Sequence, residues 1–194
     1  WRVRSLDVPR GFGLVSRLIF GISKPRQPIL GVELAGDVES TGRNVKRFKP
    51  GDPVFAISGN MGAYAEYKCL PEDSAVAMKP SNLSYEEAAA LSFGGTTALS
   101  FFRRGNLQRG ETLLINGASG GVGTAAVQLA RHFGAIVTGV CSTANVELAK
   151  SLGCDRVIDY TREDFTRIGG TWDLIMDTAG TAPFSRIKTS LQEK

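Results

Sequence analysis

The strongest constraint on the fold is the stretch LLINGASGGVGTAAVQLARHFGA, residues 113–135, in which an apolar run leads into four glycines. Glycine loses the most backbone entropy on folding, so four glycines within the seven residues 117–123 need a reason. The residues that follow place apolar side chains on one helical face, as a helix packed on a sheet requires. These residues are Val122, Ala126, Leu129, Ala130 and Phe133. We predict a strand over 111–116, a glycine turn, and a helix over 121–134.

Strand-like and helical segments alternate in the rest of this half. AIVTGV (135–140), DRVIDY (155–160) and WDLIMDTAG (172–180) have the apolar character of strands, and ANVELAKSLG (144–153) that of a helix ending at Gly153. A further helix is expected after Pro183, continuing to the end of the chain. Apolar strands separated by helices are typical of a parallel sheet covered on both faces. The pattern predicts a doubly wound α/β domain.

The first half has a different pattern, rich in glycine and proline. GVELAGDVEST (31–41), DPVFAIS (52–58), AYAEYKCL (63–70) and SAVAMKP (74–80) are β-like runs separated by turn signals. They predict a small, mostly antiparallel β domain. Ser84 and Glu87 then have the spacing of a capping box that opens a helix through Leu91, and GGTTALSFF (94–102) is expected to start another helix.

Composition excludes several classes of function. The net charge of +4 comes from scattered lysines and arginines, which favours a solvated surface over a nucleic-acid partner. No apolar run approaches the length that spans a bilayer, so we expect no membrane partner. Cys69, Cys141 and Cys154 are odd in number and form no CxxC, so neither a disulfide framework nor a cysteine zinc site is indicated. These features favour a cytoplasmic protein and leave an organellar location open.

A strand, a glycine turn and a helix together form the unit that binds dinucleotides. The pattern here is Ala118-x-Gly120-x-x-Gly123, with alanine at the first glycine position. The N–H groups at the helix start and the helix dipole attract the pyrophosphate. A glycine turn that serves only the fold is the alternative. The predicted pyrophosphate site comprises Ala118, Ser119, Gly120, Gly121, Val122 and Gly123.

The end of the next strand indicates which dinucleotide is bound. In sheets that bind NAD, an acidic residue about 20 positions past the glycines takes the ribose 2′-hydroxyl. Here that place has CSTAN, residues 141–145, and the next acid is Glu147, inside the predicted helix. Ser142 and Asn145 can donate hydrogen bonds to a 2′-phosphate, which a carboxylate would repel. We therefore predict NADPH over NADH; a simple capping role for Ser142 is compatible with this.

Six motifs occur in order along the chain: ILGVELAGDV, RFKPGDPVFA, GAYAEY, GGTTAL, NGASGGVG and SLGCDRVIDY. Together they resemble the medium-chain dehydrogenase/reductase superfamily, and more narrowly its zinc-independent, zeta-crystallin-like quinone oxidoreductase branch. The resemblance implies a GroES-like domain with a connecting helix over 1–92 and a Rossmann domain over 93–194, both incomplete. It places the active site in the cleft between the two domains, and it makes a homodimer possible in the full-length protein.

The resemblance also bears on zinc. Zinc-dependent members carry Gly-His-Glu where this chain has Gly31-Val32-Glu33, and valine cannot ligate a metal. They also carry a four-cysteine lobe, whereas no cysteine lies between Phe55 and Gly62 here. The one histidine, His132, is expected to be an exposed helical residue. We therefore expect no zinc.

The implied function is an NADPH-dependent oxidoreductase that reduces a small-molecule quinone or α,β-unsaturated carbonyl. By resemblance, Thr97 lies near the nicotinamide, Tyr160 near the adenosine phosphate, and Thr178 and Gly180 beside the nicotinamide ring. No catalytic acid is assigned, and Tyr64 is either a cleft residue or a strand aromatic. Two alternatives stay open: an enoyl-thioester reductase or reductase module of a larger synthase, and a non-enzymatic NADPH sensor or crystallin-like protein.

Overall fold

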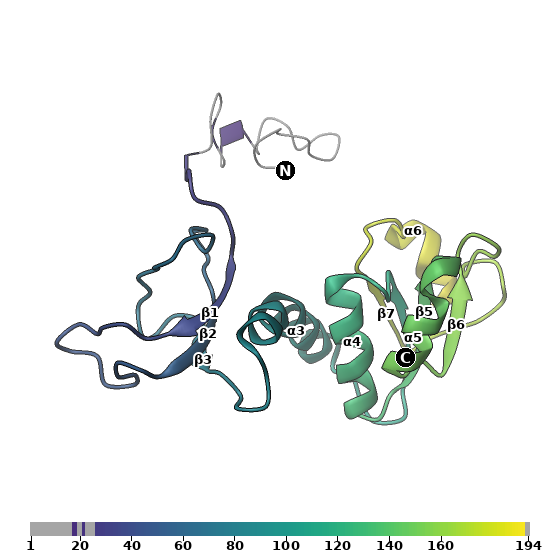
Figure 1. Cartoon of the computed structure of the whole chain (residues 1–194). Coiled ribbons are helices and arrows are strands. Elements are labelled where there is room, and N and C mark those ends of the chain that lie inside the picture. The colour runs from purple at the N-terminus through teal and green to yellow at the C-terminus, as the bar shows by residue number, and fades with distance from the viewer. Residues whose placement is uncertain (1–16, 19–20, 22–25, 193–194) are drawn as a thin grey trace. The chain divides into compact units, whose positions relative to one another are not determined.

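The computed structural model describes residues 17, 18, 21 and 26–192 (Figure 1). Its contacts divide the chain into two compact units, Trp1–Ala90 and Leu91–Lys194. Each unit is described by itself below. No helix among the residues that the structure describes is both long and apolar enough to cross a membrane.

The first unit contains a small antiparallel sheet, as predicted. Its strands are β1 (Glu33–Asp37), β2 (Pro53–Ile57) and β3 (Val76–Met78), in the order β1-β2-β3. Both pairings are antiparallel, and Ala35 of β1 lies opposite Phe55 of β2. Val54 and Ala56 point into the core while their neighbours are partly exposed, which is the alternation that a one-sided sheet requires.

The strand predicted over 63–70 is wrong, because these residues form an irregular loop. Tyr64 and Tyr67 are 77% and 73% exposed, so neither aromatic residue of this stretch is buried against a sheet. The loop is held instead by Lys68, whose Nζ donates to Asn60 Oδ1 at 3.1 Å and to the Met61 carbonyl at 2.8 Å. The Tyr64 ring lies against Gly31, where a Cβ would overlap it.

The two helices predicted after Ser84 are one continuous helix, α3 (Tyr85–Gly105). The predicted capping box is confirmed: Ser84 N–H donates to Glu87 Oε2 at 2.9 Å, and Glu87 N–H donates to Ser84 Oγ at 3.1 Å. The helix continues through Gly94. The absence of a side chain at Gly94 allows α3 to pack closely against the start of the helix that begins at Gly121. A Cβ at Gly94 would lie 2.5 Å from the Gly121 carbonyl oxygen.

The second unit is built on a parallel sheet, as predicted. Its strands are β4 (Thr112–Asn116), β5 (Ile136–Cys141), β6 (Arg156–Asp159) and β7 (Leu174–Asp177), in the order β6-β5-β4-β7. All three pairings are parallel. The chain adds β5 and β6 on one side of β4 and then places β7 on the other side. The strand order therefore reverses at β4.

Helices complete this unit. The helix α4 (Gly121–His132) follows β4, and α5 (Val146–Leu152) follows β5 after the short 3₁₀ turn η1 (Thr143–Asn145). As predicted, α5 ends at Gly153, whose φ of 110° is left-handed. The helix predicted after Pro183 begins there as α6 (Phe184–Ile187). It does not continue to the end of the chain, because it gives way to η2 (Lys188–Ser190).

The core lies on both faces of this sheet. Alternate residues of β4 point to opposite sides: Leu113 and Ile115 belong to a cluster with Ala126 and Ala130 of α4, and Leu114 belongs to a second cluster. The second cluster contains Val140, Ile158, Phe165, Trp172, Ala182 and Ile187. The sheet is therefore covered on both faces, which leaves its strand ends as the place for polar chemistry.

Candidate dinucleotide site

The glycine turn after β4 folds back over the end of β5. The N–H groups of Gly117 and Ala118 both donate to the Val140 carbonyl at 3.0 Å. The left-handed conformation of the turn falls on Gly117, with φ 86°, so alanine is accommodated at 118. Ala118 is fully buried, and its Cβ would lie 3.0 Å from a Cβ on Gly139 of β5. The alanine at the first position of the glycine pattern is therefore a packing residue.

The four glycines of the turn are not equivalent. Gly117 is required by its positive φ, and Gly123 by packing, because a Cβ there would overlap the Gly117 carbonyl oxygen. Gly120 and Gly121 have no such need. A Cβ on Gly120 would meet its nearest neighbour, the Gly117 carbonyl oxygen, at an ordinary 3.4 Å, and a Cβ on Gly121 would meet nothing within 4 Å. Neither residue has a positive φ. The fold itself gives no reason for these two positions to be bare.

The N-terminus of α4 is suited to an anion. The N-cap residue, Gly120, provides no side-chain hydrogen bond to the first turn, and the first turn contains no acidic residue. The amide N–H groups there lack intrahelical acceptors by helix geometry, and the helix dipole adds partial positive charge. Bare backbone and uncapped amides fit a pyrophosphate at this place.

The ends of β5 and β6 bring together the residues predicted to select the cofactor. Asn145 Nδ2 donates to Ser142 Oγ at 3.1 Å. The Tyr160 N–H donates to the Cys141 carbonyl at 3.0 Å, and the Tyr160 side chain is exposed. Ser142, Asn145 and Tyr160 therefore lie at one edge of the sheet, beyond its carboxyl ends.

An acid that the sequence analysis did not consider also lies at this edge. Asp159 ends β6 directly opposite Cys141 in the parallel register. The Thr143 hydroxyl donates to its Oδ2 at 2.5 Å, the Thr161 hydroxyl donates to its Oδ1 at 2.7 Å, and Arg162 Nε lies 3.4 Å from Oδ2. The hydrogen bond from Thr143, followed by those from Thr161 and the charge of Arg162, lowers the pKa of Asp159. This carboxylate is therefore occupied by its own neighbours, and Arg162 forms an ion pair with it.

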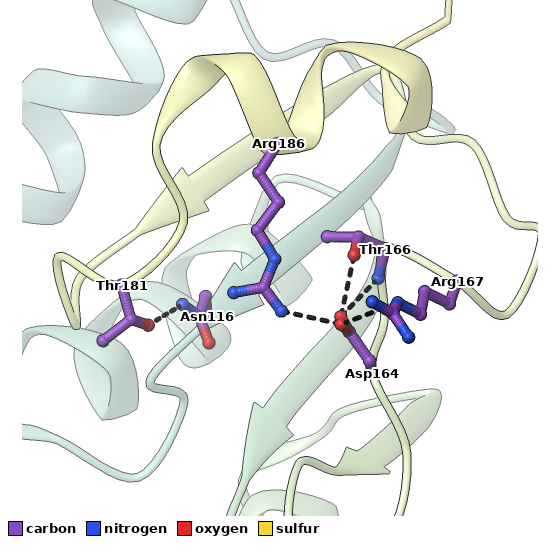
Figure 2. Close-up of polar contacts among 6 residues, drawn as sticks. All are labelled: Asn116, Asp164, Thr166, Arg167, Thr181 and Arg186. Carbon is purple, nitrogen blue, oxygen red and sulfur yellow. Dashed lines mark hydrogen bonds and ion pairs between the residues drawn. The ribbon is translucent and has the colours of Figure 1, made fainter.

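Thr178 and Gly180 lie in the loop that follows β7, next to the carboxyl end of β4. The Thr178 hydroxyl donates to the Asn116 carbonyl at 2.8 Å, and a Cβ on Gly117 would lie 2.6 Å from it. Gly180 has a left-handed φ of 68°. Asn116 and Asp177 were not among the predicted site residues, yet they hold this loop. Figure 2 shows Asn116 at the end of β4 pointing to Thr181, with Nδ2 and Oγ1 at 3.0 Å.

The predicted residues thus fall into three groups. Residues 118–123 form the turn and the start of α4, which follow the central strand β4. Ser142, Asn145 and Tyr160 follow β5 and β6 on one side of β4, and Thr178 and Gly180 follow β7 on the other side. In open α/β sheets ligands bind outside the carboxyl ends of the strands where the order reverses, and here that point is β4. Thr97 lies outside these groups, half-buried on α3 and one turn beyond Gly94.

Comparison with known proteins identifies the family. Residues 12–80 match the alcohol dehydrogenase GroES-like domain, and residues 121–193 match the zinc-binding dehydrogenase family. The order of the two matched domains agrees with the structure, in which the antiparallel sheet precedes the parallel sheet. The chain belongs to the medium-chain dehydrogenase/reductase superfamily. The predicted fold class, a GroES-like β domain followed by a Rossmann-type domain, is confirmed.

Several proteins to which this chain is similar are named as reductases or quinone oxidoreductases. A 2-methylene-furan-3-one reductase of Solanum lycopersicum is 40% identical over 166 residues, 80% of this chain and 42% of the relative. The trans-enoyl reductase pgmF of Aspergillus terreus is 37% identical over 177 residues, 86% of this chain and 49% of the relative. The structure of Escherichia coli quinone oxidoreductase complexed with NADPH has a TM-score of 0.79 at 30% identity, covering 93% of this chain and 58% of that one. The chain spans about half the length of the curated relatives that it matches.

The family includes members that bind zinc, so the possible ligands matter. Val32 stands where zinc-dependent members have histidine, and His132 is exposed at the end of α4, as predicted. Within residues 17, 18, 21 and 26–192, no group of three or more His, Cys, Asp or Glu side chains could hold a metal ion.

Proposed function

We propose that this chain is part of an NADPH-dependent reductase that delivers hydride to a quinone or an α,β-unsaturated carbonyl without zinc. The observation that carries the proposal is the bare backbone at Gly120 and Gly121, at the uncapped start of α4. The fold does not require side chains to be absent at these two positions, whereas a pyrophosphate lying against the amides would require it.

The remaining predicted residues would bind the two ends of the cofactor. Ser142 and Asn145, with Tyr160 beside them, would bind the ribose 2′-phosphate through hydrogen bonds. Thr178 and Gly180 would lie beside the nicotinamide, together with Thr97 of α3. The strand-end geometry supports the assignments of Ser142, Asn145, Tyr160, Thr178 and Gly180, since each of these residues follows the carboxyl end of a parallel strand, whereas Thr97 is assigned by the family resemblance alone.

The reduced nicotinamide supplies the hydride when it is bound. The chain's own residues orient it and hold it against the sheet, so the protein contributes proximity and position. Without a metal to polarise a carbonyl, the best acceptor is one that spreads negative charge by conjugation. The substrates named for the relatives, a 2-methylene-furan-3-one, a trans-enoyl group and a quinone, are acceptors of this kind.

An enoyl-thioester reductase is the second candidate, favoured by the trans-enoyl reductase relative. A panel of NADPH with a small quinone, an enone and an enoyl thioester distinguishes the candidates by loss of the reduced-nicotinamide absorbance. Turnover of the thioester alone would favour the second candidate. Tight NADPH binding with no turnover of any acceptor by the full-length protein would favour a sensor or crystallin-like role.

The binding site itself is tested by Gly120→Ala. The added methyl fits the fold, so the melting temperature should stay within a few degrees, but NADPH binding should weaken by about tenfold or more, equivalent to ~1.4 kcal/mol. Gly42→Ala, whose added methyl would meet its nearest neighbour, Val45 Cγ2, at 3.9 Å, is the control and should leave the affinity unchanged. Unchanged NADPH affinity in Gly120→Ala would contradict the proposed site.

A further inference from the structure

We infer that Asp177 is a positioning residue for the dinucleotide: its carboxylate sets the loop 178–182 against the glycine turn. The inference rests on the proposed function, because the loop contains Thr178 and Gly180 of the proposed nicotinamide site. It adds a residue that touches neither the cofactor nor the substrate in that proposal.

The hydrogen bonds of Asp177 define the loop. Its Oδ1 accepts from the N–H groups of Ala179 at 3.1 Å and Gly180 at 3.0 Å, and its Oδ2 accepts from the N–H of Ala182 at 2.8 Å. The fourth hydrogen bond to the carboxylate, and the third to Oδ1, comes from Asn116 Nδ2 at 2.9 Å. A carboxylate offers about four acceptor sites, so all of its capacity is used within the protein.

Asn116 joins this loop to the glycine turn. Its side chain is buried at the end of β4, where it lies opposite Asp177 in the parallel register. Both hydrogens of Nδ2 are used, one toward Asp177 and one toward Thr181 Oγ1 at 3.0 Å, as the latter bond in Figure 2 shows. The next residue in the chain is Gly117, the first residue of the turn.

The loop and the turn are in direct contact as well. The N–H of Thr178 donates to the Asn116 carbonyl at 3.0 Å, and its hydroxyl donates to the Asn116 and Gly117 carbonyls at 2.8 and 3.2 Å. Asp177 therefore fixes the distance between the residues proposed for the nicotinamide and the turn proposed for the pyrophosphate. These two parts of one ligand must be held at a set separation.

Replacing the carboxylate by an amide should break this arrangement. In Asp177→Asn one acceptor oxygen becomes an NH₂ group, which would face N–H donors of Asn116 or the loop. We expect NADPH to bind about tenfold more weakly, since bonds to a charged group are worth more than neutral ones. We also expect faster hydrogen exchange at the amides of Ala179, Gly180 and Ala182 in the protein without cofactor.

Asp173 provides a matched control on the same pair of strands. It precedes β7 at the opposite end, where its Oδ2 accepts from the Thr112 N–H at 2.9 Å and from the Thr112 hydroxyl at 2.7 Å. Asp173→Asn also removes the charge of an aspartate that joins β4 to β7, but it leaves the loop 178–182 intact. It should lower the melting temperature and leave NADPH affinity within about twofold of wild type.

The experiment measures NADPH dissociation constants by fluorescence titration, melting temperatures, and amide exchange for wild type and both variants. A selective loss of affinity and loop protection in Asp177→Asn supports the inference. Equal affinity in the two variants overturns it while the proposed function stands, and a wild-type protein that binds no NADPH overturns both. If Asp177→Asn does not fold, Thr181→Val removes only the second acceptor of Asn116. It should weaken NADPH binding a few-fold, and unchanged affinity would overturn the inference.

Discussion

Arg186 donates a hydrogen bond from Nη2 to Asp164 Oδ2 at 2.7 Å and so joins α6 to the loop that follows β6 (Figure 2). The same carboxylate accepts from the N–H and hydroxyl of Thr166 at 3.0 and 2.8 Å, and Arg167 Nε lies 3.7 Å from it. The hydrogen bond from Arg186, and then those from Thr166, lower the pKa of Asp164 from 3.8 to about 2. The loop and α6 both cover one face of the sheet, where Phe165 and Ile187 share a cluster.

This contact predicts an acid-sensitive contribution to stability. The folded pKa lies below the unfolded value, so the contribution is fully present above pH 3.8 and is lost as the pH falls toward 2. Asp164→Asn should lower the free energy of unfolding at pH 6 by about 1 kcal/mol, a value discounted for partial exposure. In urea unfolding the difference from wild type should vanish near pH 2. Glu163→Gln, at the exposed neighbouring position, is the control; a difference that persists at pH 2 would contradict the assigned cause.

A second prediction concerns the choice between NADPH and NADH. Ser142→Asp places a carboxylate at the end of β5, where it would repel the 2′-phosphate and accept from the 2′-hydroxyl of NADH. The ratio of NADPH to NADH affinity should fall by about tenfold or more. Fluorescence titration with each cofactor measures it. Ser142→Ala removes one donor and adds no charge, so it should change the ratio only a few-fold; equal effects of the two substitutions would argue against a phosphate at this position.

The parts of the structure that depend on neighbours in sequence could be predicted from the sequence. The capping box of Ser84 and Glu87, the turn at Gly117 and the end of α5 at Gly153 are each set within a few residues. The strand predicted around Tyr64 was wrong because β-like residues favour a strand only where a sheet face buries them, and Tyr64 and Tyr67 are both exposed. The break predicted at Gly94 was wrong because that glycine serves a contact with Gly121, distant in the chain.

The candidate site was predictable to the same extent. The glycine turn has a local signature, whereas Asp159 and Asp177 act on residues far away in the sequence. Asp159 bonds to Thr143 across 16 positions, and Asp177 bonds to Asn116 across 61. Both pairs form because parallel strands bring their carboxyl ends together, so the strand order was needed to find them.

Metal analysis provides a third prediction. Because Val32 cannot ligate zinc and His132 lies exposed on α4, the purified protein should contain well under one zinc per chain. Treatment with EDTA should change neither the melting temperature nor the affinity for NADPH. A protein purified in zinc-containing medium and dialysed serves as the comparison. Stoichiometric zinc that survives dialysis would require a ligand set that the described residues do not provide.

The three cysteines should differ sharply in reactivity. Cys69 is exposed, whereas Cys141, the last residue of β5, and Cys154, which precedes β6, are buried in the same core cluster. Burial raises the pKa of Cys141, with a smaller contribution from the charge of Asp159. Burial, and then the neighbouring Cys141 and Asp155, raise the pKa of Cys154 to about 11. Since the thiolate is the reactive form, neither buried thiol should react in the native protein at pH 8.

A disulfide reagent with a chromogenic leaving group measures this directly. One of the three thiols should react within minutes, and the other two only after denaturant is added. Cys69→Ser should abolish the fast reaction and leave the slow one unchanged. Cys154 Sγ packs against Gly139 of β5, where an added Cβ would lie only 2.6 Å from the sulfur. Fast reaction of Cys154 would therefore mean that the packing at β5 is looser than described. Since Gly139 also packs against Ala118, such a result would call into question the position of the glycine turn itself.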